Sequence, residues 1–179
     1  MHKHRARSLH YDLRLEAHGV MPSWSVPKGP SLDPSARRLA IPAGPHELEY
    51  RRFEGVIPGG SYGASAVMIW DQGTYAPEVE TSGTRRAVKD RDEADEVAVS
   101  GLREGNLKFV LFGQKLKGSF ALVRTKGLGP SREAWLVIKY RDSYCRAGYD
   151  ANDYDLSAET GRSPTKILQA GLDRTQGYL

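Results

Sequence analysis

The sequence has very little cysteine and no long apolar run. Cys145 is the single cysteine among 179 residues, so no disulfide can form within the chain, and we expect a reducing compartment such as the cytoplasm. There is no stretch of about 18 apolar residues that could cross a bilayer. The first residues, MHKHR, are charged and do not resemble the apolar core of an export signal. These absences argue against a disulfide-rich secreted module and a helical membrane protein, and they predict no membrane partner.

The net charge is small, but its distribution is informative. Lys and Arg number 26 against 22 Asp and Glu, which gives a charge of +4 and a pI near 9.2, too modest to establish a nucleic-acid partner. All five histidines lie within the first 46 residues, and Asp12 is the only acid in residues 1–14. The length and a mean hydropathy of −0.54 suit one globular domain spanning 1–179.

Alternation of apolar and polar residues dominates the chain. The segment LHYDLRLE, 9–16, places four apolar side chains on one face of a strand and His10, Asp12, Arg14 and Glu16 on the other. Further strands are predicted at 23–26, 38–41, 65–70, 108–112, 119–125 and 134–140. Turn-forming residues separate them, at 27–30, 58–60, 71–73 and 127–130. We therefore expect a mainly β fold, a compact β-barrel of short antiparallel strands, because closure removes exposed sheet edges.

One or two short helices complete the predicted fold. The first covers 95–103, and the second is opened by Ser163-Pro164 in a C-terminal tail, 163–179. The charged stretch 77–95 shows neither the helical nor the strand periodicity of apolar residues, and it is predicted to be a mobile surface loop. Trp24, Trp70 and Trp135 lie within predicted strands and are expected in the core.

The polar face of 9–16 carries residues suited to phosphate chemistry. Successive members of the triplet His10, Asp12 and Arg14 lie about 6.6 to 7 Å apart at Cα in a strand, so their side chains can converge on one ligand. Imidazole and carboxylate bind divalent metals, and an arginine fork binds phosphate oxygens. A half-buried strand with internal salt bridges shows the same alternation. The presence of His4 and His46 nearby in the sequence favours a metal and phosphate site over an ordinary strand. His2 and His18 are interpreted as bystanders.

Several ordered blocks strengthen this interpretation. HKHRARSLHYDLRLE is followed by SWSVPKGPSLDP, RRLAIPAGPHELEY, FEGVIPGGSYGASAVMIWDQGTY, LKGSFALVRTKG and WLVIKYRD. From His4 to Asp142 the chain strongly resembles the 3′-phosphoesterase domain of bacterial DNA ligase D and its stand-alone homologues. The resemblance implies a β-barrel with a crescent-shaped groove and a Mn²⁺-dependent activity, with Co²⁺ or another divalent transition metal as the alternative. Such enzymes remove a 3′-terminal ribonucleoside and then the 3′-phosphate from primer-template ends, leaving a 3′-OH.

The resemblance also implies roles for individual residues. It makes His4, Asp12 and His46 the metal ligands, His10 a contact or general acid at the scissile phosphate, and Arg14 the phosphate-binding arginine. Tyr50 matches the tyrosine of the phosphomonoesterase step, and Lys28 and Arg38 match supporting basic residues. Ala43-Gly44-Pro45 departs from a usually acidic stretch. Ligase and polymerase sequences do not accompany these blocks, so we expect a ligase, a polymerase and Ku-like repair proteins to act in trans.

Two other functions stay open at this point. His10 and Asp12 with a later histidine resemble the facial triad of a non-haem iron oxygenase, although the 34 residues from Asp12 to His46 are few for that fold and Arg14 suits phosphate better. The same residues could also form a non-catalytic DNA-end-binding module. The sequence favours a metal-dependent phosphoesterase that heals DNA 3′ ends for repair and ligation.

Overall fold

The computed structural model describes residues 1–5, 8–58, 65–126 and 133–176, with side chains as far as 173. Its strands are β1 (His2–Arg5), β2 (Leu9–Arg14), β3 (Val20–Met21), β4 (Ser23–Val26), β5 (Arg37–Pro42), β6 (His46–Glu47), β7 (Gly55–Ile57), β8 (Ser65–Ile69), β9 (Gly73–Thr81), β10 (Thr84–Ala87), β11 (Asn106–Gly113), β12 (Lys117–Lys126) and β13 (Glu133–Lys139). The helices are α1 (Arg91–Glu104) and α2 (Pro164–Gln176), with the 3₁₀ turns η1 (Leu48–Arg52) and η2 (Ala151–Asp153). The predicted turn at 127–130 lies outside these described residues, as does most of that at 58–60.

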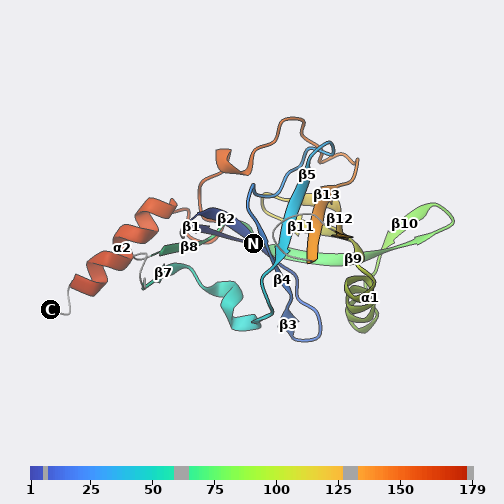
Figure 1. Ribbon diagram of the computed structural model, residues 1–179, viewed down its shortest axis with the longest axis horizontal. Coiled ribbons are helices and arrows are strands. Elements are labelled where there is room, and N and C mark those ends of the chain that lie inside the picture. The colour runs from blue at the N-terminus through green and yellow to red at the C-terminus, as the bar shows by residue number, and fades with distance from the viewer. Residues whose placement is uncertain (6–7, 59–64, 127–132, 177–179) are drawn as a thin grey trace.

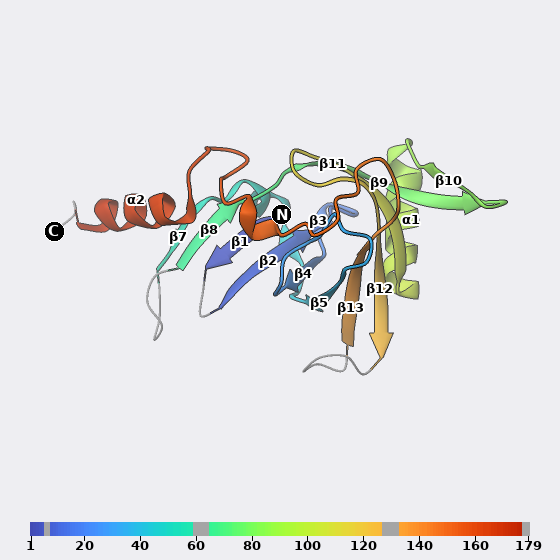
Figure 2. The same ribbon diagram turned by 90° about the horizontal axis from the view of Figure 1, so that it is seen from above.

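One large antiparallel sheet organises the molecule, which confirms the mainly β prediction. Its order is β10-β9-β11-β12-β13-β5-β4-β2-β1-β8-β7, and β3 and β6 form a separate pair. Within the described residues β10 and β7 do not pair, so the sheet is not closed and the word barrel describes it only loosely. The edges are protected in other ways: α2 packs on β7 and β8, while β10 is short and carries Arg85 and Arg86 (Figures 1 and 2).

The apolar faces of the strands form the core. Trp24, Trp70 and Trp135 are 5%, 0% and 5% exposed, as predicted for core residues. On β2, Tyr11 and Leu13 are buried on the face opposite the polar triplet, as the alternation predicted.

The segment 77–95 is regular structure, so its prediction as a surface loop was wrong. β9 continues to Thr81, a tight turn follows at Ser82 and Gly83 with φ of 50° and 77°, and β10 returns antiparallel. β10 is largely polar, and in β9 a proline, Pro77, lies between Tyr75 and Val79 and weakens the strand signal. α1 then begins at Arg91, four residues before the predicted start, because the Asp90 side chain caps it by accepting from Glu93 N at 2.9 Å.

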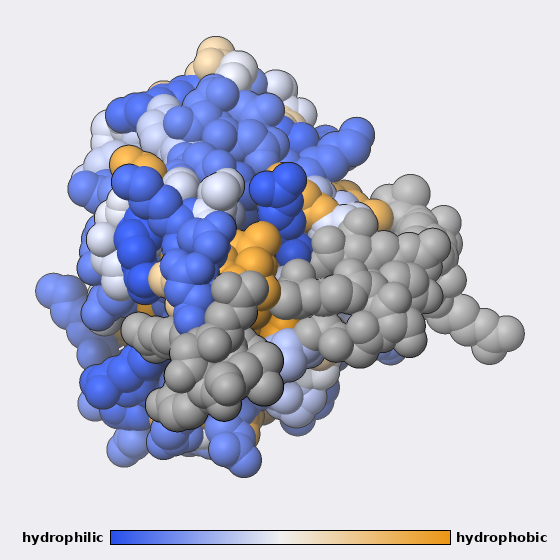
Figure 3. All heavy atoms as spheres, turned by 90° about the vertical axis from the view of Figure 1, so that its left-hand side faces the viewer, coloured by the Kyte–Doolittle hydropathy of each residue, from blue (hydrophilic) through white to orange (hydrophobic). Residues whose placement is uncertain are grey.

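The second predicted helix is confirmed as α2. It lies beside β7 and β8 at one end of the sheet (Figure 1), where Ile167 is buried. A Cβ at Gly171 would lie 2.2 Å from Val56 Cγ2, so the absence of a side chain there lets the helix approach β7 closely. The face seen from this end is mainly hydrophilic, with an apolar strip near its centre (Figure 3). None of the helices in the described part of the chain has both the length and the apolar character needed to span a bilayer.

Candidate active site

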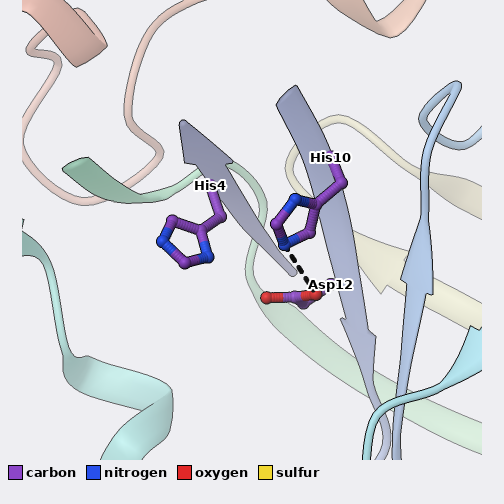
Figure 4. Close-up of side chains that lie close together, drawn as sticks. All are labelled: His4, His10 and Asp12. Carbon is purple, nitrogen blue, oxygen red and sulfur yellow. Dashed lines mark ion pairs between the residues drawn. The ribbon is translucent and has the colours of Figure 1, made fainter. Parts of the chain in front are cut away.

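Two adjacent strands bring three metal-binding side chains together. β1 and β2 pair antiparallel with His4 directly opposite His10, and Asp12 follows two residues later on the same face as His10. One ligand atom from each of these side chains lies within 4.8 Å of the others, and His10 Nε2 is 3.6 Å from Asp12 Oδ1 (Figure 4). The hairpin register therefore builds a compact cluster of two imidazoles and one carboxylate, the His4–His10–Asp12 cluster.

The surroundings of this cluster suit a bound cation. The Ser8 carbonyl lies 3.1 Å from His10 Nδ1 and can only accept a hydrogen bond, so the neutral ring carries its proton there and leaves the Nε2 lone pair facing Asp12. Burial, and then the neighbouring His10, lower the pKa of His4, which keeps that imidazole in the metal-binding neutral form. Two neutral imidazoles and a carboxylate are a donor set for a divalent transition metal, so these residues fit such an ion.

Arg14 lies next to the cluster and is fixed by hydrogen bonds along its guanidinium. Its Nη2 donates to Asp12 Oδ2 at 3.2 Å, which links the arginine directly to the cluster. Nε donates to His2 Nδ1 at 3.2 Å, and Nη1 donates to Ser23 Oγ at 2.8 Å and to His46 Nδ1 at 2.7 Å. These four bonds use four of the five guanidinium N–H groups, so among the described residues one N–H on Nη2 is left for a ligand.

His46 lies on the Arg14 side of the site and outside the cluster. β6 pairs with β3 so that His46 stands opposite Met21, and its Nδ1 also lies 3.3 Å from Ser23 Oγ. Because arginine only donates, Nδ1 of His46 must accept, and the neutral ring carries its proton on Nε2. Burial, and then the charge of Arg14, lower the pKa of His46. Of the ligands predicted by resemblance, the structure brings His4 and Asp12 together, with His10 as the third member in place of His46.

The interpretation of His2 as a bystander missed its place in the site. His2 stands opposite Asp12 in the β1–β2 ladder, is 2% exposed, and accepts from Arg14 while its Nε2 is buried without a partner in the described structure. Burial, followed by nearby positive charges that include Arg14, lowers the pKa of His2 to about 3. A polar four-residue strand gives no periodic signal, so only the register of β1 reveals this position. His18 is exposed and lies 3.7 Å from Asp95.

The ring of Tyr50 packs against residues on the Arg14 side of the site. It belongs to η1, its ring lies 5.5 Å from that of His2 and 5.1 Å from that of His46, and the Arg14 guanidinium is 5.0 Å from its centre. Burial raises the pKa of the phenol, which therefore keeps its proton. The predicted Tyr50 and Arg14 thus lie together.

Lys28 and Arg38 are the two predicted site residues that no contact among the described side chains links to the cluster or to Arg14. Lys28 is exposed in the turn after β4. Arg38 lies in β5, and its buried Nε has no partner among the residues that the structure describes. Among the described side chains, neither has a hydrogen bond or ion pair with the cluster or with Arg14. Ser23 and Ser65 are the site residues that sequence reasoning overlooked: Ser23 faces Arg14 through the β2–β4 register, and Ser65 Oγ is 3.1 Å from His4 Nε2.

Comparisons with known proteins cover the part of the chain that carries this site. A family model for the DNA ligase D 3′-phosphoesterase domain matches residues 2–124, which include the cluster, Arg14, His46 and Tyr50. A multifunctional non-homologous end joining protein LigD from Pseudomonas aeruginosa is 42% identical over 145 residues, covering 81% of this chain and 15% of the relative.

Relatives from other bacteria match to a similar extent. The LigD proteins of Mycobacterium tuberculosis and Mycolicibacterium smegmatis are 39% and 38% identical over 140 residues, 78% of this chain. The chain spans only 15% to 16% of the length of these relatives. Both the matched range and the identities show that the chain belongs to the DNA ligase D 3′-phosphoesterase domain family.

Proposed function

We propose that this chain is a metal-dependent phosphoesterase that heals DNA 3′ ends. It removes a 3′-terminal ribonucleoside, a 3′-phosphate or both, and leaves a 3′-OH for repair and ligation. The observation that carries the proposal is the shared carboxylate of Asp12, which belongs to a three-ligand cluster and also holds the phosphate-binding group of Arg14. The family and the names of its relatives, which are end-joining proteins, support the same conclusion.

His4, His10 and Asp12 would hold the metal. We propose His10 in place of His46 as the third ligand, because its Nε2 faces Asp12 whereas Nδ1 of His46 is occupied by Arg14. Mn²⁺ is the first candidate and Co²⁺ the next, since a mixed imidazole and carboxylate set accepts both. When bound, such a cation polarises a phosphoryl oxygen and neutralises part of the phosphate charge.

The remaining residues bind the phosphate and hold protons. The free N–H of Arg14 donates to a phosphate oxygen and stabilises charge that develops there. His46 offers Nε2–H, and the phenol of Tyr50 offers O–H, as further donors to phosphate or to the departing 3′ oxygen. The contact with Arg14 makes the neutral His46 a hydrogen-bond donor and not a proton donor, because losing the Nε2 proton would leave an imidazolate. Removal of the 3′-phosphate forms a bond from water oxygen to phosphorus, breaks the bond from phosphorus to the 3′ oxygen, and transfers a water proton to that oxygen. Removal of the terminal ribonucleoside forms the same bond from water, breaks the bond from phosphorus to the 5′ oxygen of that nucleoside, which takes the water proton, and leaves a 3′-phosphate.

Two histidines and one carboxylate also form the iron site of some oxygenases. Arg14 favours phosphate, because its guanidinium charge is held beside the cluster and one N–H remains to donate to a phosphoryl oxygen. The family match points in the same direction. The substrate implies a cytoplasmic protein that works with a ligase, a polymerase and Ku-like end-binding proteins in trans.

A primer-template assay with a panel of metals tests the proposal. A labelled primer ending in a 3′-phosphate or a 3′-ribonucleotide is incubated with the protein and Mn²⁺, Co²⁺, Cd²⁺ or chelator. We expect Mn²⁺-dependent release of phosphate, and a loss of about 100-fold or more in His10→Ala and Arg14→Ala. His18→Asn and Arg141→Ala, which change exposed residues away from the site, serve as matched controls.

The outcomes separate the candidate functions. Wild-type turnover in either site variant would contradict the assignment of residues. Tight binding of the ends without phosphate release in any metal would select a non-catalytic end-binding module. Oxygen consumption with Fe²⁺ and a 2-oxo acid would select the oxygenase.

A further inference from the structure

β1 brings two imidazoles into the candidate active site but carries no apolar side chain. His2 and His4 lie on the face that carries the site, and Lys3 between them lies on the other face. A slip of one residue along β2 would exchange the two faces and remove both histidines from the site. Apolar residues usually exclude such a slip because they have to be buried, and the sequence His-Lys-His-Arg contains none. A polar interaction therefore has to set the register of β1.

Lys3 makes such an interaction on the face opposite the site. Its side chain is 5% exposed, and Nζ donates to Asp155 Oδ1 at 2.7 Å and to Asn152 Oδ1 at 3.4 Å. Nζ also lies 5.2 Å from the centre of the ring of Tyr11, the residue opposite Lys3 in β2. A buried ammonium group is costly unless it is paired. Even a slip of two residues, which keeps the faces, would carry Lys3 about 7 Å away from its partners.

Both partners of Lys3 belong to one segment, 150–162, which is attached to the strand on each side of β1. On the β2 side, the Tyr11 hydroxyl donates to Asn152 Oδ1 at 3.0 Å. On the β8 side, the indole Nε1 of Trp70, the residue after that strand, donates to the carbonyl of Tyr154 at 2.7 Å. The partners of Lys3 are therefore fixed relative to the strands that β1 joins.

The same segment has a second anchor further along. The Ala158 N–H donates to the carbonyl of Ile69 at 2.8 Å, and Ile69 stands opposite His2 in the pairing of β1 with β8. Glu54, whose side chain is 5% exposed, accepts from Ser157 Oγ at 2.5 Å. These contacts hold the segment in place independently of Lys3.

We propose that Lys3 is a positioning residue, which fixes the register of β1 against the 150–162 segment and so places His2 and His4 in the site. Lys3 contacts neither metal nor substrate and acts through the strand. The inference deepens the proposed function and rests on it, because His4 is a proposed metal ligand. The family model matches residues 2–124, so the segment that supports the site lies outside the matched range.

Mn²⁺ binding and a ring contact test this proposal without turnover. Lys3→Met keeps the length of the side chain and removes the ammonium group. We expect Mn²⁺ affinity, measured by electron paramagnetic resonance, to fall about tenfold or more, as is usual when the support of a ligand is lost. The nuclear Overhauser effect between the rings of His4 and His10, whose centres lie 4.9 Å apart, should weaken in the metal-free protein (Figure 4). Lys3→Arg, which can still pair with Asp155, should keep most of both signals.

Asp155→Asn tests the other end of the same contact. The Asp155 side chain is 51% exposed, so its replacement leaves the core intact, and Mn²⁺ affinity should fall as in Lys3→Met. The double variant Lys3→Met/Asp155→Asn should bind Mn²⁺ no more weakly than Lys3→Met, because both changes remove one contact. Lys117→Met in β12 and Asp153→Asn in η2 change exposed residues and are the matched controls, which should bind Mn²⁺ as the wild type does.

The outcomes separate a positioning role from a merely structural one. A structural role would lower the melting temperature and leave Mn²⁺ affinity and the ring contact unchanged below it, and that result in Lys3→Met and Asp155→Asn overturns the proposal. If Lys3→Met does not fold, Asp155→Asn decides by the same measurements, and if the wild type binds no Mn²⁺, the ring contact decides. Phosphate release is measured separately, so a wild type that binds Mn²⁺ without releasing phosphate contradicts the proposed function and not the role of Lys3.

Discussion

Arg14 and His46 form the shortest of the hydrogen bonds around the arginine, with 2.7 Å between Nη1 and Nδ1. The donor is fixed by chemistry, since a guanidinium has no lone pair to offer, and so the imidazole must present its own lone pair to it. One contact therefore sets the tautomer of His46, directs its N–H away from Arg14, and removes its Nδ1 from metal binding. The resemblance connects His10 with the phosphate and His46 with the metal. The contact with Arg14 instead keeps Nδ1 of His46 away from the cluster that contains His10.

The first prediction concerns which histidines bind the metal. His4→Ala and His10→Ala should each abolish measurable Mn²⁺ binding, because each removes one of the three proposed ligands. His46→Ala should keep Mn²⁺ affinity within about threefold of wild type but lose turnover, since it removes a proposed phosphate donor and not a proposed ligand. Electron paramagnetic resonance of bound Mn²⁺, titrated in parallel with phosphate release, measures both. Loss of Mn²⁺ binding in His46→Ala would restore His46 to the metal set.

The second prediction concerns the shape of the Arg14 side chain. Arg14→Lys keeps the charge but cannot make four separate bonds to His2, Ser23, His46 and Asp12. We expect kcat/KM for a 3′-phosphate primer to fall by about 100-fold, nearly as far as in Arg14→Ala. Arg141→Lys, on the exposed surface, is the matched control and should be silent. Recovery of most activity by Arg14→Lys would show that charge alone is needed.

The third prediction makes His2 a positioning residue for Arg14. His2→Ala removes the acceptor of the Nε bond, whereas His2→Asn can place an amide oxygen near the position of Nδ1. We expect His2→Ala to lower kcat about tenfold, with Mn²⁺ affinity unchanged, and His2→Asn to recover much of that loss. A purely structural role would instead lower the melting temperature of both variants without this difference in kcat.

Sequence reasoning found seven strands and missed others, among them β1 and β9. All seven predicted strands have counterparts, from β2 to β13. β1 was missed because its residues, His-Lys-His-Arg, show no apolar alternation, although it is hydrogen-bonded on both sides, to β2 and to β8. In β1, polar residues of the site occupy the positions where an ordinary strand carries apolar side chains.

The site could be predicted in composition but not in arrangement. The alternation in β2 correctly puts His10, Asp12 and Arg14 on one face. The choice of third histidine depends on the register of β1, which sets His4 opposite His10, and no local signal encodes that register. The place of Ser23 likewise follows from the pairing of β2 with β4.

The fourth prediction tests the contact that attaches α2 to the sheet. Gly171→Ala adds a Cβ that would lie 2.2 Å from Val56 Cγ2, so either the helix or β7 must shift. We expect a loss of about 1 to 3 kcal/mol in the free energy of unfolding, measured by urea denaturation, in spite of the better helix propensity of alanine. The double variant Gly171→Ala/Val56→Ala should be closer to Val56→Ala alone, because the smaller side chain makes room. Stabilisation by Gly171→Ala would show that the helix does not pack here.

The fifth prediction concerns stability in acid. The pKa values of His2, His4 and His46 are all lowered in the folded protein, that of His2 to about 3, from a usual value near 6.5. Below pH 6.5 the unfolded chain therefore takes up protons that the folded protein does not, so the stability that neutral histidines contribute above pH 6.5 declines as the pH falls. For His2 the decline continues to about pH 3, where the folded protein also becomes protonated. Urea denaturation of the metal-free protein between pH 7.5 and pH 4 should show this loss, and His2→Asn should make its slope shallower by removing one titrating group. His18→Asn, which changes an exposed histidine, is the control, and an equal effect of the two substitutions would contradict the prediction.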